Sequence, residues 1–244
     1  FDDLDAAMMI HPGAENRLGG RTNALMPLKF EFFGKNAHAC HPQEGRSALD
    51  AAVNTFVAIN MLRQFMEPGS FIHGIVKDGG EAANVIPAYA SLEYYFRAPT
   101  MAVAKAMSQR AVECAEGACQ MAGTTLKTSM YECPYEDNKI NYTLCSLLEK
   151  QYVELGLSEI QPVDEVPGGS SDIGAVSYRC PALHGYIQIC GCEVTGHSRE
   201  MAAATISPQG RSGLENGASA LAMCAVELAS DPQLLRQVKE EFMR

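Results

Sequence analysis

The sequence predicts an α/β fold in which a small α+β domain is inserted into an α/β body. The pattern of residues 28–131 runs strand, helix, strand, strand, helix, strand, which is the order of a ferredoxin-like unit. An α/β pattern resumes after Pro134, and the apolar run at residues 6–10 is typical of a buried parallel strand that Pro12 and Gly13 end. We therefore assign residues 26–134 to the inserted domain, and residues 1–25 with 135–244 to one body.

The inserted domain is expected to contain four strands and two helices. Strands are predicted where apolar residues alternate or where β-branched and aromatic residues gather, at residues 28–34, 71–76, 88–97 and 124–131. One helix starts near Gly45, and a second follows Pro99 and ends near Gly123. The first helix carries apolar residues at helical spacing: Leu49, Val53, Phe56, Ile59 and Leu62.

The body is expected to add helices and one further strand after the inserted domain. We predict a helix over residues 138–155, a loop at 166–172 that leads into a short helix, and a strand at 182–189. A last long helix is predicted to carry one apolar stripe, formed by Leu214, Ala218, Leu221, Ala225 and Leu228.

Charge and cysteine content exclude some classes of partner. The 244 residues include 29 acidic and 19 basic side chains, for a net charge of −10. Nucleic acids and anionic membranes need a positive surface, so we expect neither as a partner. The nine cysteines form no CxxC pair and no regular framework, which indicates reduced thiols in a cytoplasmic protein.

The beginning of the chain predicts a larger parent. The sequence opens on Phe1, and a buried strand is expected within about five residues of it. Because a buried strand needs neighbours on both sides, we expect this chain to be the C-terminal portion of a longer or trimmed protein.

Two histidines are candidates for metal ligation. His11 follows a predicted parallel strand, and open α/β sheets bind ligands where their strands end. A neutral imidazole there suits zinc, although a packed, hydrogen-bonded histidine explains the same position. His197 lies in a polar loop between a strand and the last helix, where either interpretation applies. No compact metal motif such as HExxH is present.

Two other segments can be interpreted either as anion-binding elements or as ordinary structural features. The loop at residues 168–172 offers backbone N–H groups to an anion, or is an ordinary loop in which Ser170 or Asp172 caps the next helix. Arg97 ends an aromatic strand, where it binds a carboxylate or forms a surface ion pair. Asn84 precedes it by 13 residues and alone indicates little.

Several segments together resemble a family of zinc-dependent amidohydrolases and peptidases. This is peptidase family M twenty, which includes aminoacylase, carboxypeptidase G and p-aminobenzoyl-glutamate hydrolase. The similarity to the branch of β-alanyl-lysine-type dipeptidases and p-aminobenzoyl-glutamate hydrolases is greatest. The matching segments run in family order: DAAMMIHPG at 5–13, GKNAHACHP at 34–42, GRSALDAA at 45–52, ANVIP at 83–87, YFRAP at 95–99, GSSDIG at 169–174 and GHS at 196–198.

The resemblance implies a role for each matching residue. His11 and His197 would each bind one of two Zn²⁺ ions per subunit, with Mn²⁺ or Co²⁺ as alternatives. His38 would reach across a homodimer to polarise the scissile carbonyl, while His41 is a neighbour of the site. The remaining residues would contact substrate: Asn84 and Arg97 would grip it, Arg97 by its free carboxylate, and Gly169 and Ser170 would line the pocket.

The implied protein is a metal-dependent hydrolase of small molecules. It would cleave an amide bond beside a free carboxylate, in a dipeptide, an N-acyl amino acid or an aminobenzoyl-glutamate type of substrate. The implied fold is part of a zinc-exopeptidase-type catalytic body with an inserted lid and dimerisation domain.

The chain also departs from the family pattern. The family's first metal-binding His-x-Asp, its bridging Asp and its Glu-Glu pair precede the equivalent of Asp5, and none occurs here. We therefore expect this chain alone to be inactive. The alternative function is a non-catalytic dimerisation or binding fragment without the dinuclear site.

Overall fold

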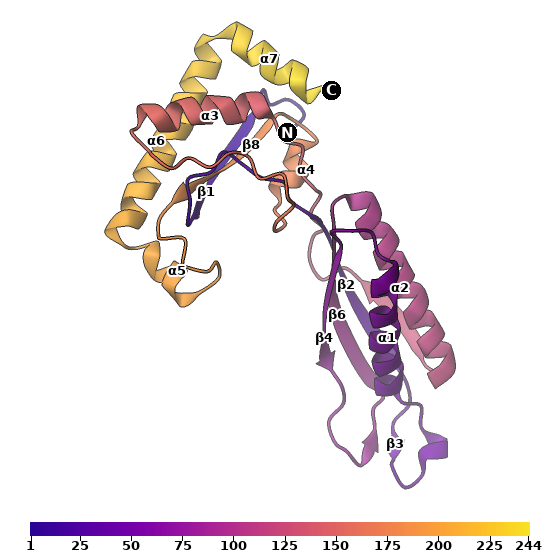
Figure 1. The fold of residues 1–244 in the computed structure, drawn as a ribbon. Coiled ribbons are helices and arrows are strands. Elements are labelled where there is room, and N and C mark those ends of the chain that lie inside the picture. Colours follow the sequence, from indigo (N-terminus) through magenta and orange to yellow (C-terminus); the bar gives the residue numbers. More distant parts are fainter. The chain divides into compact units, whose positions relative to one another are not determined.

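The computed structural model describes residues 1–244, which form two compact units (Figure 1). The body comprises Phe1–Thr22 and Asn138–Arg244, and the inserted domain comprises Asn23–Asp137. Each limit of the inserted domain lies three residues outside the range expected from the sequence. The mixture of helices and strands confirms the predicted α/β class.

The inserted domain is a four-stranded antiparallel sheet with two helices. The strands lie in the order β4-β6-β2-β7, so the first and third strands of the unit are the central pair. This is the strand order of a ferredoxin-like unit. Two short strands pair separately, β3 (Ala37–His38) with β5 (Val85–Ile86). The main elements are β2 (Ala24–Phe33), α1 (Ala48–Leu62), β4 (Phe71–Asp78), β6 (Tyr89–Ala98), α2 (Met101–Ala122) and β7 (Thr125–Ser129).

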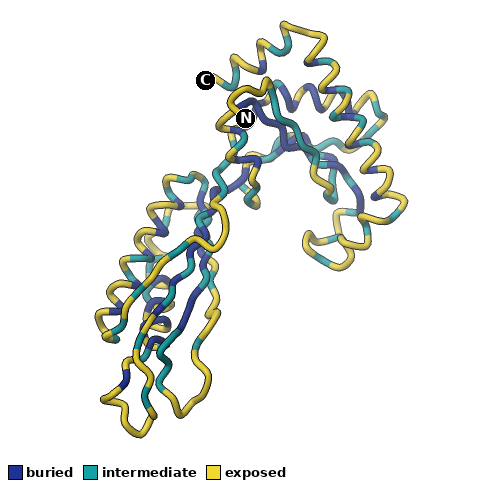
Figure 2. Tube along the Cα trace, turned by 180° about the vertical axis from the view of Figure 1, so that it is seen from behind, coloured by how far each residue is buried: buried dark blue, intermediate teal, exposed yellow.

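Aromatic residues of β2 and β6 form the core of the inserted domain. Phe30 and Phe96 are fully buried and both rings lie against Tyr94, at centroid distances of 5.9 and 5.8 Å. Gly74 of β4 leaves room for this cluster, since a Cβ there would overlap the ring of Tyr94. Burial follows the strands and one side of each helix in Figure 2.

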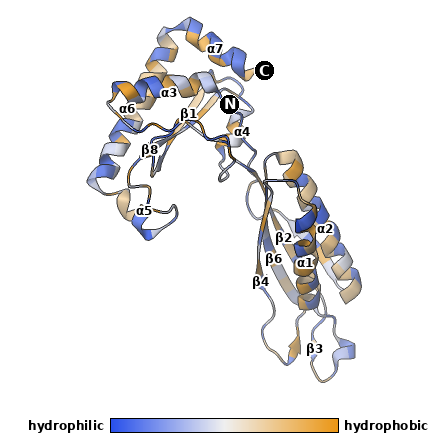
Figure 3. Cartoon of the chain, viewed as in Figure 1, coloured by the Kyte–Doolittle hydropathy of each residue, from blue (hydrophilic) through white to orange (hydrophobic).

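The predicted apolar stripe of α1 is buried only in part. Ile59 is fully buried, and Leu49 and Leu62 are half-buried, but Val53 is 48% exposed and Phe56 37%. Figure 3 shows hydrophobic colour along much of the helix. The side that packs on the sheet consists mainly of small residues, because α1 also packs closely beside α2. Its buried residues are Ala48, Ala51, Ala52, Thr55 and Ile59.

The body is built on two parallel strands, β1 (Ala7–Gly13) and β8 (Ala182–Gln188). The strand expected at residues 6–10 is longer in the structure, because β1 continues through Pro12 to Gly13 and places His11 inside the strand opposite Tyr186. Since β1 pairs only with β8, the missing N–H of Pro12 is tolerated as on an edge strand. The residues of β1 are exposed or half-buried, whereas the sequence predicted a buried strand.

The expected last helix is two helices with a different buried face. Asp231 ends α6 (Pro208–Ser230) and caps α7 (Pro232–Phe242). The predicted stripe is wrong at Leu214, which is 72% exposed. A Cβ at position 213 would lie 2.6 Å from Ile189 Cγ2, so glycine allows α6 to approach the sheet closely. The buried face consists of Gly210, Gly213, Gly217, Ala220, Cys224 and Leu228.

Three further helices complete the body: α3 (Tyr142–Glu154), α4 (Ile173–Ser177) and α5 (Arg199–Ala204). Asn141 starts α3 by accepting a hydrogen bond from the backbone N–H of Leu144 at 3.0 Å. All nine cysteines are free thiols. None of the helices combines the length and the apolar character that crossing a membrane requires.

Candidate functional site

One cavity in the body brings together four of the seven residues assigned from the resemblance. Its volume is about 460 Å³, and its walls include His11, Gly169, Ser170 and His197. These residues come from β1, from the loop before α4 and from the loop between β8 and α5. The cavity is also lined by Arg17, Arg21, Asp164, His184 and Tyr186, among others.

The ring of His11 is held by the backbone of the next residue. Its Nδ1 lies 2.8 Å from the carbonyl oxygen of Pro12. A carbonyl only accepts hydrogen bonds, so Nδ1 carries the proton and Nε2 of the neutral ring keeps a lone pair. Metal-ligating histidines commonly donate their second nitrogen to a carbonyl or carboxylate in this way. This hydrogen bond leaves Nε2 as the atom through which His11 could act as a ligand.

His197 has an unusual backbone conformation. Its φ of 60° lies in the left-handed region, which residues other than glycine occupy rarely and at a cost of order 1–3 kcal/mol. The next residue, Ser198, caps α5, since its Oγ accepts a hydrogen bond from Met201 N at 3.0 Å. Such strain is concentrated at functional sites, and here it occurs in the loop that brings His197 to the cavity wall.

His184 is a cavity residue to which the sequence assigned no role. It is 8% exposed, and neither ring nitrogen has a hydrogen-bond partner. Burial, followed by the electrostatic effect of His11, lowers the pKa of His184 to about 4, so the His184 ring is neutral at pH 7. The sequence did contain a signal for this residue. Side chains alternate along a strand, so the predicted strand 182–189 places residues 184 and 186 on the same face of the sheet.

The charged residues of the cavity pair with neighbouring side chains. Arg17 lies 2.6 Å from Glu15 and 3.2 Å from Asp164. Arg21 donates a hydrogen bond of 2.8 Å to Glu165, which lies outside the cavity lining. The cavity therefore presents imidazoles and backbone groups beside mutually neutralised charges.

One interpretation of the loop at residues 168–172 was an ordinary loop in which Ser170 or Asp172 caps the next helix. The structure does not show this cap. Asp172 occupies the N-cap position of α4, but its side chain makes no capping hydrogen bond, and Ser170 lies before the cap. The loop is anchored instead through Gly168 N, which donates to Arg21 O at 3.1 Å. This anchoring keeps Gly169 and Ser170 at the cavity.

Two of the assigned residues lie together in the inserted domain. His38 is on β3 and pairs with Val85, next to Asn84, whose carbonyl accepts from Ala39 N at 2.9 Å. The His38 Nδ1 accepts a hydrogen bond from Cys40 N at 3.1 Å. Nε2 of neutral His38 therefore carries the proton and is a hydrogen-bond donor.

Arg97 lies at the other end of the same domain. Eight residue steps along β6 separate Tyr89 from Arg97, a length of about 26 Å at about 3.3 Å per residue. The Arg97 guanidinium lies over the ring of Tyr95, 5.6 Å from its centroid. Within one inserted domain, Arg97 is therefore far from Asn84 and His38.

The body brings two candidate metal ligands to one cavity. Imidazole nitrogen is a preferred ligand of Zn²⁺, and both His11 and His197 present rings at the cavity. No group of three or more His, Cys, Asp or Glu side chains is arranged to hold a metal ion. The donor chemistry fits zinc, while a complete tetrahedral set needs further ligands.

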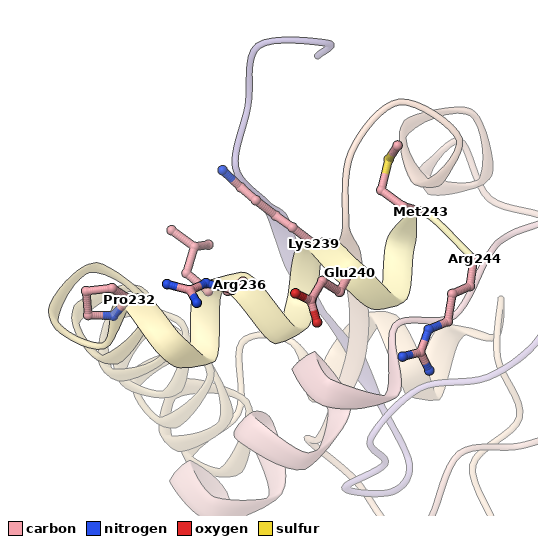
Figure 4. Close-up of a pocket in the computed structure, with 7 residues that line it drawn as sticks. Pro232, Arg236, Lys239, Glu240, Met243 and Arg244 are labelled. Atoms are coloured by element: carbon pink, nitrogen blue, oxygen red, sulfur yellow. The ribbon is translucent and has the colours of Figure 1, made fainter.

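A second hollow carries no comparable chemistry. It measures about 550 Å³ and is lined only by residues of α7 and the chain end, which Figure 4 shows along one side of the helix. Lys239 there is paired with Asp5. Since its charged groups do not converge from separate elements, we do not place the functional site there.

Known proteins share both the sequence and the fold. Residues 22–119 match the family model of the peptidase dimerisation domain. The chain is 36% identical to Xaa-Arg dipeptidase of Mus musculus over 245 residues, covering 99% of this chain and 57% of that protein. It is 37% identical to one of the subunits of p-aminobenzoyl-glutamate hydrolase from Escherichia coli (strain K12) over 130 residues, covering 52% of this chain and 27% of that protein.

A solved structure has the same fold. The aminobenzoyl-glutamate utilization protein from Klebsiella pneumoniae matches with a TM-score of 0.67 at 21% identity, over 88% of this chain and 55% of that one. The chain thus spans about half the length of the dipeptidase and of the structure that it matches. The chain belongs to the peptidase family of these dipeptidases and aminobenzoyl-glutamate hydrolases, family M twenty, and carries its peptidase dimerisation domain.

Proposed function

We propose that this chain is part of a metal-dependent hydrolase that cleaves an amide bond beside a free carboxylate. The observation that carries the proposal is that His11 and His197, 186 positions apart in sequence, line one cavity with Gly169 and Ser170. Xaa-Arg dipeptides and p-aminobenzoyl-glutamate, the substrates named for the relatives, share a free carboxylate beside the amide bond.

The proposed metal site uses the two imidazoles. His11, through Nε2, and His197 would each hold one Zn²⁺, with Mn²⁺ or Co²⁺ as alternatives, and other donors would complete the site. Bound metal would supply Lewis acidity and a water of lowered pKa. The backbone of Gly169 and Ser170 would line the substrate pocket.

The inserted domain would orient the substrate. His38 would donate its Nε2 proton in a hydrogen bond to the scissile carbonyl oxygen, on which negative charge develops. Arg97 would bind the carboxylate bidentately, and Asn84 would hold the amide or the carbonyl. Because Arg97 lies far from His38 and Asn84 within one domain, we propose that the two sets serve the sites of different subunits in a homodimer.

The surface of the inserted domain supports this dimer. α1 exposes Val53, Val57 and Met61, and the neighbouring sheet edge, β4, exposes Ile75 and Val76. An open strand edge beside exposed apolar residues favours pairing with another copy. The match to a peptidase dimerisation domain over residues 22–119 favours a second copy of this chain as the occupant.

The test is hydrolysis by the protein as its gene encodes it. We expect turnover of a Xaa-Arg dipeptide or of p-aminobenzoyl-glutamate, loss of turnover with a chelator and recovery with Zn²⁺. Arg97→Ala should reduce kcat/KM by at least about a hundredfold for the free acid and much less for its C-terminal amide. Arg110→Ala, an exposed arginine paired with Glu113, is the control. Equal losses on acid and amide would contradict the role of Arg97.

A second candidate function is a non-catalytic dimerisation or binding module. The observation that favours it is that no three potential ligands are arranged to hold a metal ion. In that case the protein forms a stable dimer, binds no zinc and hydrolyses neither substrate. Metal analysis of the purified dimer distinguishes the two functions.

A further inference from the structure

His184 is a buried imidazole whose hydrogen-bonding capacity is unused. It lies on β8, is 8% exposed and lines the same cavity as His11 and His197. Both Nδ1 and Nε2 lack a partner. Leaving buried polar atoms unpaired is unfavourable, and each such group in a native protein indicates strain, a functional role, or a bound water or ion. The position of His184 in the cavity wall favours a bound species.

A second imidazole of the same cavity, that of His11, lies close to His184. β1 and β8 pair Met9 with His184 and His11 with Tyr186, so His11 and His184 are diagonal neighbours on one face of the sheet. Their ring centroids are 6.0 Å apart at an interplanar angle of 59°. Tyr186 stacks on His184 at 4.8 Å and thereby fixes the plane of the ring.

Each of the two rings has a nitrogen lone pair that no hydrogen bond uses. The proton of His11 is on Nδ1, directed to Pro12 O, which leaves the Nε2 lone pair. Neutral His184 likewise has one nitrogen with a lone pair. The Asp172 carboxylate favours positive charge near the His184 ring.

We propose that His184 supplies a second imidazole nitrogen to the divalent cation bound at His11. Two imidazoles that share one tetrahedral Zn²⁺, with Zn–N distances of about 2.0–2.1 Å, have ring centroids about 5 Å apart. The centroids of His11 and His184 are 6.0 Å apart, so the two rings would need to approach by about 1 Å on binding. This inference rests on the proposed metal function and adds a ligand that the family resemblance does not assign. Borderline cations such as Zn²⁺ and Co²⁺ suit such a pair of nitrogens.

The test measures metal binding directly, without turnover. Zn²⁺ is titrated into the whole chain by calorimetry, and the histidine ring nitrogens are followed by ¹⁵N NMR. We expect a nitrogen resonance of His184 to shift with that of His11 as Zn²⁺ binds. His184→Phe, which retains a ring to stack on Tyr186, should weaken Zn²⁺ binding at least tenfold, and His184→Gln should do the same. His73→Phe, which replaces a histidine stacked on Phe71 in the inserted domain, is the matched control.

The outcomes separate this inference from the proposed function. If His11→Phe abolishes Zn²⁺ binding while both His184 variants bind within twofold of the wild type, His184 is not a ligand and the metal function stands. An unshifted His184 resonance at saturating Zn²⁺ overturns the inference even if the variants misfold. Absence of Zn²⁺ binding by the wild-type chain also overturns it, and hydrolysis by the gene-encoded protein then decides the proposed function separately.

Discussion

Nδ1 of His11 lies 2.8 Å from the carbonyl oxygen of Pro12, so that one residue sets the tautomer of the residue before it. His38 is held in the opposite way, because its Nδ1 accepts from Cys40 N at 3.1 Å. One ring is left with a lone pair at Nε2 and the other with a proton there. A ligand needs the former, and a hydrogen-bond donor to a carbonyl needs the latter.

These hydrogen bonds predict the neutral tautomers. In the metal-free chain we expect His11 to be protonated at Nδ1 and His38 at Nε2, because each bond permits one arrangement only. Long-range ¹H–¹⁵N spectra assign the protonated nitrogen of each neutral ring. The exposed ring of His41 serves as the reference for an unconstrained mixture. If His11 and His38 showed the same tautomer, the contrasting roles proposed for them would lose their structural basis.

The exposed side of α1 predicts a change in oligomeric state. Val57→Glu combined with Met61→Glu places two charges on a surface that is 48% and 63% exposed in the single chain. We expect sedimentation to show a monomer, with the free energy of unfolding changed by only about 0.5 kcal/mol. Met121→Glu on α2, at a residue that is 71% exposed, should leave the dimer intact. A dimer that survives the double substitution places the interface elsewhere.

The close packing of α6 predicts a severe effect of a small substitution. In Gly213→Ala the new Cβ would lie 2.6 Å from Ile189 Cγ2 and 3.2 Å from Gln188 O, so the helix must shift. We expect the free energy of unfolding to fall by about 1–3 kcal/mol in urea titration. Gly117→Ala on α2 has no heavy atom within 4 Å and should raise it by about 0.5–1 kcal/mol. Similar destabilisation by both substitutions would refute the packing explanation.

The stability of the inserted domain should depend on pH through Glu31. Its side chain is 15% exposed and accepts hydrogen bonds from Tyr89 Oη at 2.9 Å and Lys29 Nζ at 3.1 Å. The Tyr89 hydrogen bond, followed by that of Lys29, lowers the pKa of Glu31. The unfolded chain therefore binds the proton more readily than the folded one, and stability rises with pH across this window.

This contribution is present above the unfolded pKa, about 4.3, and is lost as the pH falls through the lower pKa of the folded state. Glu31→Gln should remove about 1 kcal/mol or less at pH 6 and flatten the dependence between pH 6 and pH 3. Glu113→Gln, at an exposed pair on α2, is the control. Unfolding titrations at both pH values make the measurement, and an unchanged slope in Glu31→Gln would contradict the assignment.

The sequence by itself determined the order of elements and the family. Strand alternation and helical period are local properties, so residues 28–131 were sufficient to predict a ferredoxin-like unit. The segments around His11, His38 and His197 carry the family resemblance without reference to any contact. Which side of an element is buried is not local, because it depends on what packs against it. Val53 and Phe56 of the α1 stripe are therefore exposed although Ile59 is buried, and α6 is buried through glycines rather than through Leu214.

Only the tertiary structure decided which histidines share a cavity. A loop carries His197 to the cavity that His11 lines, and the pairing of β1 with β8 sets His184 beside His11. No spacing in the sequence encodes these distances, since they depend on which strands become neighbours and on how the loops between them close. The tautomers of His11 and His38 were equally hidden, because a single backbone atom at hydrogen-bond distance determines each of them.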